Sequence, residues 1–258
     1  MQVVIYALQY QTPSSAPFLE KKAAYRTATA PIDIAITDQT IAVTDLMKSL
    51  SLISYTPSPP GTGALDTLKE ISRHFETCWG TAVACVGENT YLQSDAEGNL
   101  VVLQHEKEGF SEEIRRRLRV VSEMQLGEMV NRIRPISVTA STSAAVIPRA
   151  FLATVEGGVY LFGLIATGKQ DLLIRLQTAL AEVIRAPGDV PFAQFRGFRS
   201  EVREAGDEGP SRFVDGELIE RFLDLGEAVH ESVIKALPEG APGVEEVRGI
   251  VEGLRRMR

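Results

Sequence analysis

The spacing of apolar residues changes once along the chain, near Gly168, and this change constrains the fold more than any other feature. Before Gly168 the apolar residues form short, β-branched runs with a period of two, as in the Ile-Asp-Ile-Ala-Ile run at 32–36. Between 172 and 184 they follow a period of 3.6 instead. A chain with this order of patterns is expected to fold as a β-rich part followed by helices.

Turn residues divide the first 167 residues into many short runs that predict strands. These runs lie at 3–6, 32–36, 40–43, 50–55 and 82–86, and hairpin turns are predicted at 37–39, 87–89, 95–98 and 156–158. Many short strands at even spacing are typical of a barrel, a sandwich or a propeller. The proline-rich stretch 56–63 predicts an exposed loop. The segment 65–75 is ambiguous, because Leu65, Leu68, Ile71 and Phe75 have helical spacing.

Helices are predicted at 172–185, 215–225, 227–237 and 244–257. The second of these has the clearest start, because Asp215 can cap it and Glu217 places a negative charge at the positive end of the helix dipole. We therefore divide the chain into a β domain at 1–167 and a helical domain at 168–258.

Composition and charge limit the kinds of partner. The chain has 258 residues, of which 44% are hydrophobic and 24% charged, as in ordinary folded proteins. Residues 201–258 hold 8 Lys and Arg against 14 Asp and Glu, which accounts for six of the seven net negative charges. The remaining residues are nearly neutral and show no basic stripe, so tight DNA binding by this chain alone is not expected. The apolar run at 159–166 is too short to cross a membrane, and the N-terminus lacks a secretory pattern, so an intracellular protein is predicted.

The residues that usually carry chemistry are few and scattered. The three histidines lack metal-motif spacing and are expected at the surface or partly packed, and the two cysteines are expected to be buried, reduced thiols. The Gly-rich stretch 61–64 lacks the lysine and hydroxyl ending of a phosphate loop. The cluster Arg115–Arg119 follows Glu112 and Glu113 and is interpreted as a solvated loop, with contact to nucleic acid or to an acidic partner as the alternative. No catalytic residues, no metal and no cofactor are predicted, and the chain is not expected to be an enzyme.

Four stretches, taken in order, resemble a known family. They are Asp45-Leu46-Met47-Lys48-Ser49, Ile71-Ser72-Arg73-His74-Phe75 followed by Trp79, Leu126-Gly127-Glu128-Met129-Val130-Asn131, and Phe213 to Leu225. Their order is similar to that in the C-terminal region of the large subunit of UV-damaged DNA-binding protein. That region belongs to the superfamily named for the C-terminal part of the cleavage and polyadenylation specificity factor A subunit. More distant resemblance extends to propeller proteins of pre-mRNA cleavage and splicing.

This resemblance implies a fold that is mainly β with an α-helical C-terminal domain. Residues 1–167 would form the last blades of a β-propeller, incomplete in this chain, and 168–258 a small helical bundle. The segment 65–75 would then be an outer strand. Family members have three propellers, so the chain is expected to be a fragment of a larger protein, in which other strands would cover the open sheet edges.

The resemblance also implies a non-enzymatic adaptor that binds WD-repeat-type substrate receptors of a cullin-RING E3 ubiquitin ligase in the DNA damage response. The cullin would be held only by propellers absent from this chain, contact with DNA or RNA would be indirect, and no membrane is involved. The nucleus, and also the cytoplasm, is the expected location. The alternative is a nucleic-acid-binding subunit of the mRNA cleavage and polyadenylation or splicing machinery.

The family places its receptor-binding residues on a cleft between propellers. The corresponding positions in this chain are Ile32, Leu46, Lys48, Arg73, Trp79, Met129, Asn131 and Val155. By this resemblance Trp79 would be an aromatic anchor, Lys48 and Arg73 would pair with acidic or carbonyl groups, and Asn131 would cap exposed backbone. Lys48 and Met129 stand where family members tend to carry Arg and Phe. Packing between blades is the alternative role for each apolar residue.

Overall fold

The computed structural model describes residues 1–11, 16–59, 61, 64–139, 144–200, 209–238 and 240–257. Contacts within the chain divide it into two compact units. The first unit comprises Met1–Ala96, Val101–Val120 and Met129–Ile133, and the second comprises Glu97–Leu100, Val121–Glu128 and Arg134–Arg258. The predicted domain boundary at 167/168 stays a prediction.

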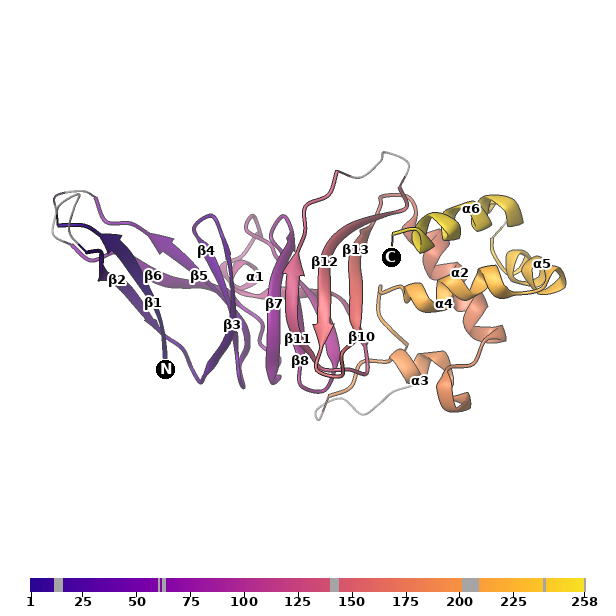
Figure 1. Ribbon diagram of the computed structural model, residues 1–258, viewed down its shortest axis with the longest axis horizontal. Helices are drawn as coiled ribbons and strands as arrows, with labels where there is room; N and C mark the ends of the chain where they lie inside the picture. The colour runs from indigo at the N-terminus through magenta and orange to yellow at the C-terminus, as the bar shows by residue number, and fades with distance from the viewer. Residues whose placement is uncertain are drawn as a thin grey trace. The chain divides into compact units, whose positions relative to one another are not determined.

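The first unit begins with a hairpin and a four-stranded sheet (Figure 1). The strands β1 (Gln2–Gln9) and β2 (Phe18–Arg26) pair antiparallel, and β3 (Pro31–Thr37), β4 (Thr40–Asp45), β5 (Ser49–Thr56) and β6 (Thr67–Arg73) follow one another in the sheet. The β3–β4 turn places Asp38 at a φ of 48°. Such positive φ values are what two-residue hairpin turns require, and Asx residues tolerate them.

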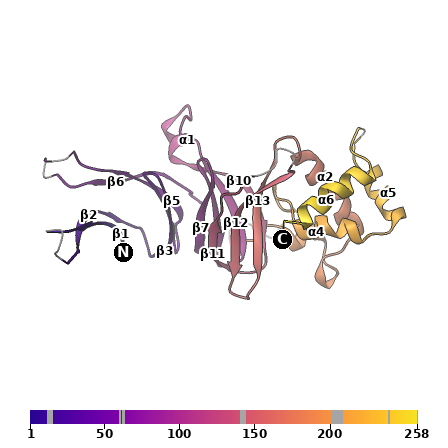
Figure 2. The same cartoon turned by 45° about the horizontal axis from the view of Figure 1, so that its top comes forward.

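Two further sheets have the same sequential order of strands. One contains β7 (Gly80–Gly87), β8 (Thr90–Asp95), β9 (Asn99–His105) and β10 (Leu118–Gln125), and the other contains β11 (Val130–Pro135), β12 (Val146–Thr154) and β13 (Val159–Ile165). Figure 2 shows β11, β12 and β13 side by side. The hairpin turns predicted at 37–39, 87–89, 95–98 and 156–158 are confirmed. These sheets confirm the prediction of a mainly β fold and are consistent with propeller blades followed by helices.

The ambiguous segment 65–75 is a strand, as the resemblance implied, and its helical spacing was misleading. Its strand β6 pairs antiparallel with β5, with Thr67 opposite Thr56 and Arg73 opposite Ser51. Leu68 packs against the cluster formed by Ile41, Val43 and Ile53, to which Val3, Ile5 and Tyr25 of the β1–β2 hairpin also contribute. Cross-strand pairing and this shared apolar face outweigh the local spacing.

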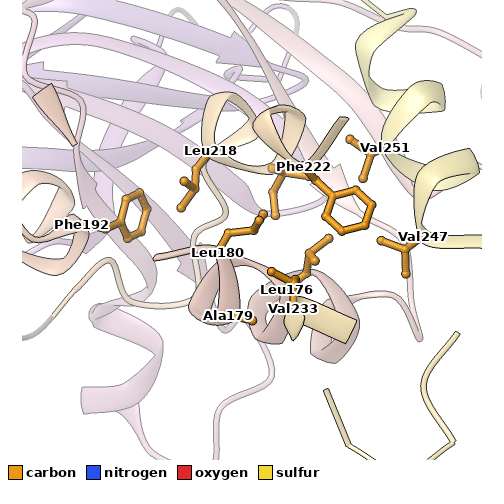
Figure 3. Close-up of a cluster of buried hydrophobic side chains, with 10 residues drawn as sticks. Leu176, Ala179, Leu180, Phe192, Leu218, Phe222, Val233, Val247 and Val251 are labelled. Carbon is orange, nitrogen blue, oxygen red and sulfur yellow. The ribbon is translucent and has the colours of Figure 1, made fainter. Parts of the chain in front are cut away.

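The C-terminal helices pack around one apolar core. They are α2 (Gln170–Val183), α3 (Phe192–Arg196), α4 (Gly216–Glu220), α5 (Glu227–Lys235) and α6 (Val244–Arg255), with the 3₁₀ turns η1 (Pro187–Asp189) and η2 (Arg221–Asp224). Figure 3 shows Leu176, Leu180, Phe222, Val247 and Val251 converging from α2, η2 and α6. Every one of these side chains is at most 1% exposed. The apolar stripes that predicted amphipathic helices therefore form a common core.

The structure corrects three details of the predicted helices. The predicted helix 215–225 breaks into α4 and η2, while α3 and η1 were not predicted. The stretch containing Arg115–Arg119 is not a loop, because α1 (Glu112–Arg116) forms there and β10 follows it. Ser111 caps α1 by accepting a hydrogen bond from Ile114 N. The predicted cap by Asp215 is confirmed, since its carboxylate accepts a hydrogen bond from Glu217 N.

The histidines are buried rather than at the surface, and each ring has a polar partner. His74 lies 2.8 Å from Ser49 Oγ through Nδ1, and His105 Nε2 lies 3.0 Å from the carbonyl oxygen of Arg115. His230 Nε2 lies 2.6 Å from the carbonyl oxygen of Phe222. Burial of these rings is tolerated because a local hydrogen bond replaces water. Sequence reasoning could not foresee those partners.

Candidate partner-binding site

The turn between β4 and β5 is held by the buried carboxylate of Asp45. Thr29 N donates to Asp45 Oδ2 at 2.8 Å, Thr29 Oγ1 donates to Oδ1, and Met47 N donates to Oδ1 at 3.1 Å. Burial raises the pKa of Asp45, but the hydrogen bonds from Thr29, Met47 and Lys48 outweigh burial and hold the pKa below its usual value. The charged carboxylate therefore fixes the turn that carries Leu46 and Lys48, whose side chains are exposed.

A buried polar network lies directly next to three of the predicted site residues. Ser49 Oγ lies 2.8 Å from His74 Nδ1 and 3.2 Å from Gln93 Oε1, and Gln93 Nε2 lies 3.0 Å from Cys78 Sγ. In the sequence, Ser49 follows Lys48, His74 follows Arg73, and Cys78 precedes Trp79. The network thus brings Lys48, Arg73 and Trp79 together from segments that are far apart in the sequence. Burial also raises the pKa of the Cys78 thiol to about 11, so the thiol stays protonated near neutral pH.

Gly80 allows β7 to approach the end of β4. A Cβ on Gly80 would lie 2.0 Å from Thr44 Oγ1 and 3.3 Å from the carbonyl oxygen of Asp45. The close approach places Trp79, which precedes Gly80, beside the turn that begins at Leu46. The Trp79 carbonyl accepts a hydrogen bond from Ala96 N at 2.8 Å, so its backbone is fixed while its side chain is 61% exposed.

Arg73 is held within the chain by a bidentate ion pair. Its Nε donates to Glu70 Oε1 at 2.8 Å and its Nη2 to Glu70 Oε2 at 2.6 Å. Tyr25 OH donates to Glu70 Oε2 at 2.5 Å, and burial followed by this bond raises the pKa of Tyr25 to about 12. A partner carboxylate would have to share the guanidinium with Glu70.

The first residues of β11 are joined to β7 and β3. The Val130 carbonyl accepts hydrogen bonds from Thr81 Oγ1 at 2.6 Å and from Ser94 Oγ at 3.1 Å. The carboxylate of Asp33 in β3 accepts from Val83 N at 3.2 Å and lies 3.4 Å from Arg132 Nη1. These contacts place Met129 and Asn131, which flank Val130, at the same strand ends as Ile32 and Trp79.

Seven of the eight predicted residues therefore lie at one set of strand ends within the first unit. We call this group the strand-end site; it consists of Ile32, Leu46, Lys48, Arg73, Trp79, Met129 and Asn131. Val155 is exposed directly after β12 and belongs to the second unit, so it is not counted in the strand-end site. That these residues bind a partner stays a prediction.

Sequence reasoning missed two exposed apolar side chains of the same segments. Met47 lies between Leu46 and Lys48 and is 50% exposed, and Phe75 follows His74 and is 60% exposed. Both belong to the stretches that carry the family resemblance, but neither was predicted as part of the site. Exposed large apolar side chains in segments that also carry an exposed tryptophan are typical of a protein-binding surface.

Most of the arginines in the basic cluster Arg115–Arg119 have hydrogen-bond or ion-pair partners within the chain. Arg115 Nη1 donates to the Gly109 carbonyl at 2.7 Å, Arg116 pairs with Glu112 at 2.6 Å, and Arg119 pairs with Glu106 at 2.5 Å. Both ion pairs are exposed, so they contribute little to stability. The carboxylate partners Glu106 and Glu112 partly neutralise the cluster, which therefore gives no support for phosphate binding.

No group of His, Cys, Asp and Glu in the described ranges could hold a metal ion. Both cysteines are free and half-buried. None of the helices that the structure describes is long and apolar enough to cross a membrane.

Comparison with known proteins agrees with the predicted resemblance. DNA damage-binding protein 1 of Schizosaccharomyces pombe is 28% identical over 236 residues, which cover 90% of this chain and 21% of that protein. DNA damage-binding protein 1b of Arabidopsis thaliana is 36% identical over 84% of this chain, and DNA damage-binding protein 1 of Solanum lycopersicum is 35% identical over 84%. The chain spans about a fifth of the length of these relatives.

The names of these relatives describe binding proteins rather than enzymes. The family model of the CPSF A subunit region matches residues 1–224, a range that includes the sheets, the strand-end site and the helices through η2. Since this match covers most of the chain, the chain belongs to the family defined by the CPSF A subunit region.

Proposed function

We propose that this chain is the receptor-binding part of an adaptor similar to DNA damage-binding protein 1. The adaptor binds WD-repeat-type substrate receptors of a cullin-RING E3 ubiquitin ligase through the strand-end site. It acts in the response to DNA damage, in the nucleus and also in the cytoplasm. The names of the relatives support a role connected with damaged DNA.

The observation that carries this proposal is an exposed aromatic side chain on a rigid support. Trp79 is 61% exposed, although it lies between the buried network of Cys78 and the close contact of Gly80 with Thr44. Because its backbone is held in place, Trp79 loses less conformational entropy on binding than a residue on a mobile loop would. Leu46, Met47 and Phe75 add exposed apolar area around it.

The same site contains polar groups that could fix the orientation of a partner. Lys48 and Asn131 are exposed, and Arg73 presents a guanidinium already oriented by Glu70. An apolar centre with a polar rim is the usual composition of a protein interface. A helical segment of a receptor would supply apolar side chains to the centre and acidic or carbonyl groups to the rim.

The contact with the cullin is proposed to lie in parts of the relatives that this chain does not match. The chain corresponds to about a fifth of their length. Contact with DNA is proposed to be indirect, through a bound receptor. The alternative role in RNA binding gains no support from the basic cluster, since Arg115, Arg116 and Arg119 have partners within the chain.

The test is binding of the full chain to purified WD-repeat receptors, measured by biolayer interferometry. Trp79→Ala should weaken binding by about 30-fold, which corresponds to the roughly 2 kcal/mol of a central aromatic hot spot. Phe110→Ala is the matched control. Phe110 is a fully exposed aromatic residue in the connection after β9, at the opposite strand ends, and its replacement should leave binding unchanged.

Two results would contradict the proposal. One is unchanged affinity of Trp79→Ala, checked to be folded by circular dichroism. The other is an equal loss of affinity in Phe110→Ala, which would indicate non-specific binding. Salt-dependent RNA binding without receptor binding would favour the alternative role in mRNA processing.

A further inference from the structure

Two strands at sheet edges, β1 and β13, lack the usual protection against pairing with another chain. Edge strands generally carry charged side chains or proline, which oppose such pairing. Among the edge strands that the structure describes, β2, β3, β6, β10 and β11 contain charged residues, whereas β1, β7 and β13 contain none. The strand β7 packs against β3 and β4, and its Val83 N donates to Asp33 Oδ2 at 3.2 Å. Within the described ranges, β1 and β13 have a neighbouring strand on one side only, so their second edges are available for pairing.

The free edge of β1 lies next to an exposed apolar surface of β3. The strand β1 packs against the buried side chains of Ile41 and Val43. Ile36 lies opposite Ile41 and Ile34 opposite Val43, so all four side chains are on the same face of the sheet. Ile34 and Ile36 are nevertheless 48% and 67% exposed, because the β1–β2 hairpin lies over β4, β5 and β6 and does not reach β3. A strand added to the free edge of β1 would lie over these two isoleucines.

The hairpin of β12 and β13 has an exposed apolar face of its own. Phe151 lies opposite Leu161, and Val159 lies two residues before Leu161, so the three side chains share one face. Phe151 is 46% exposed and Val159 is 72% exposed. The other face of the hairpin is buried within the second unit, as Leu152 and Phe162 show. Only the face with Phe151 and Val159 is therefore available for a partner.

We propose that the free edge of β1 pairs with the free edge of β13 from a second copy of this chain. The joined sheet continues the β1–β2 hairpin with β13 and β12 of the second copy. Its exposed face, with Phe151 and Val159, then covers Ile34 and Ile36. None of these residues belongs to the strand-end site, so the contact is separate from the proposed receptor-binding surface.

A second copy is the occupant that the chain itself specifies. An uncharged strand edge pairs best with another uncharged strand, because a charged side chain would lose its hydration in the joined sheet. The exposed isoleucines of β3 require a partner that also brings an apolar face. The β12–β13 hairpin meets both requirements. In one chain β1 and β13 belong to separate sheets and separate units, so their pairing needs a second molecule.

The first test is the mass of the full chain, measured by size-exclusion chromatography with light scattering. Between about 1 and 100 μM, a range in which many protein interfaces dissociate, the mass should rise above that of a single chain. The contact joins different surfaces of the two copies, so further contacts either close a ring or extend a chain of copies.

Ile34→Lys and Val159→Lys each place a charge in the proposed contact. Each variant should weaken self-association at least about tenfold, because the ammonium group would be buried among apolar side chains without a partner. Both positions are exposed in the single chain, so the variants should fold normally by circular dichroism. Leu65→Lys is the matched control. Leu65 is 78% exposed before β6 and outside both surfaces, so this variant should associate as the unchanged chain does.

Mixing the two interface variants tests which surfaces meet. The Ile34→Lys variant keeps an intact β12–β13 face, and the Val159→Lys variant keeps an intact β1 edge with its isoleucines. The mixture should therefore form a complex of one molecule of each variant, although each variant alone stays a single chain. This rescue is expected only if the surface of β1 and β3 meets the surface of β12 and β13.

Amide hydrogen exchange tests the pairing of the strand edges directly. Exchange in β1 and β13 should be slower in the unchanged chain than in the Ile34→Lys variant at the same concentration, because association gives their free N–H groups acceptors. The charged edge strand β6 is the control and should exchange at the same rate in both proteins.

Three results would overturn the proposal. A single-chain mass throughout the concentration range would leave these edges to a different protein or to further strands of a longer polypeptide. Self-association that neither lysine variant weakens would place the contact elsewhere. A mixture of the two variants that forms no complex would exclude the pairing of β1 with β13. None of these results depends on receptor binding, so the proposed function is tested separately.

Discussion

Gly80→Ala should destabilise the first unit through one identifiable clash. The new Cβ would lie 2.0 Å from Thr44 Oγ1, about 1.4 Å short of ordinary van der Waals contact at 3.4 Å. Thr44 is fully buried, and the carbonyl oxygen of Asp45 at 3.3 Å limits movement on the other side. Overpacking of this kind costs about 1–3 kcal/mol. The loss of unfolding free energy can be measured by urea unfolding monitored through tryptophan fluorescence. Trp79 is the single tryptophan and lies in the first unit, which also contains the clash.

A double-mutant cycle with Thr44 tests the assigned cause. Thr44→Ala removes the oxygen that clashes. This hydroxyl is buried and has no hydrogen-bond partner among the described residues, so the single variant should change the free energy of unfolding by less than about 1 kcal/mol. Combined with Gly80→Ala, it should recover about half of the loss or more. Thr44→Val is the matched control, because it keeps a methyl group where Oγ1 was and should recover nothing.

Two results would refute this reasoning. One is a cost below about 0.5 kcal/mol for Gly80→Ala, since surface substitutions already fall in that range. The other is equal rescue by Thr44→Val and Thr44→Ala. Either result would mean that close packing of β7 on β4 does not position Trp79 beside the turn at Leu46.

Three further predictions follow from the contacts of single residues. Asp215→Asn should cost up to about 3 kcal/mol in urea unfolding, because it removes the buried carboxylate that lies 2.7 Å from Arg196, which is 5% exposed, and leaves Arg196 only the longer ion pair with Glu217 at 3.6 Å. The lowered pKa of Asp45 means that its contribution to stability is present above the unfolded pKa of about 3.9 and is lost as the pH falls through the folded value. Asp45→Asn should therefore flatten the acid side of the stability profile, and an unchanged profile would contradict the assignment. Gly249→Ala should raise stability by up to about 1 kcal/mol in thermal unfolding, because Gly249 lies inside α6 and no atom of the described residues outside the backbone of that helix lies within 4 Å of the new Cβ.

Local patterns predicted most of the element types. Alternation in β3 and the turn residues at 37–39 and 87–89 depend on backbone preferences that act within a few residues, so the sequence predicts them directly. The apolar spacing of α2 and α6 is likewise local. Local patterns failed at the segment that forms β6. Its apolar spacing is helical, but pairing with β5 and packing on the β1–β2 hairpin make it a strand.

The predicted site came from resemblance, and the residues alone did not indicate it. Nothing in the local sequence of Trp79 distinguishes an exposed anchor from a packed core residue. Met47 and Phe75 were missed for the same reason, since exposure depends on which strand ends meet. The burial of the histidines was also predicted wrongly, because their partners are a carbonyl or a hydroxyl supplied by the fold.

The sequence by itself therefore determined the order of a β-rich part and helices, the main turns and caps, and the family. Only the tertiary structure decided that Lys48, Arg73 and Trp79 meet at one set of strand ends, through the network of Ser49, His74, Gln93 and Cys78. The physical reason is that propensities and turns act over a few residues, whereas these groups come together through packing between segments distant in the sequence.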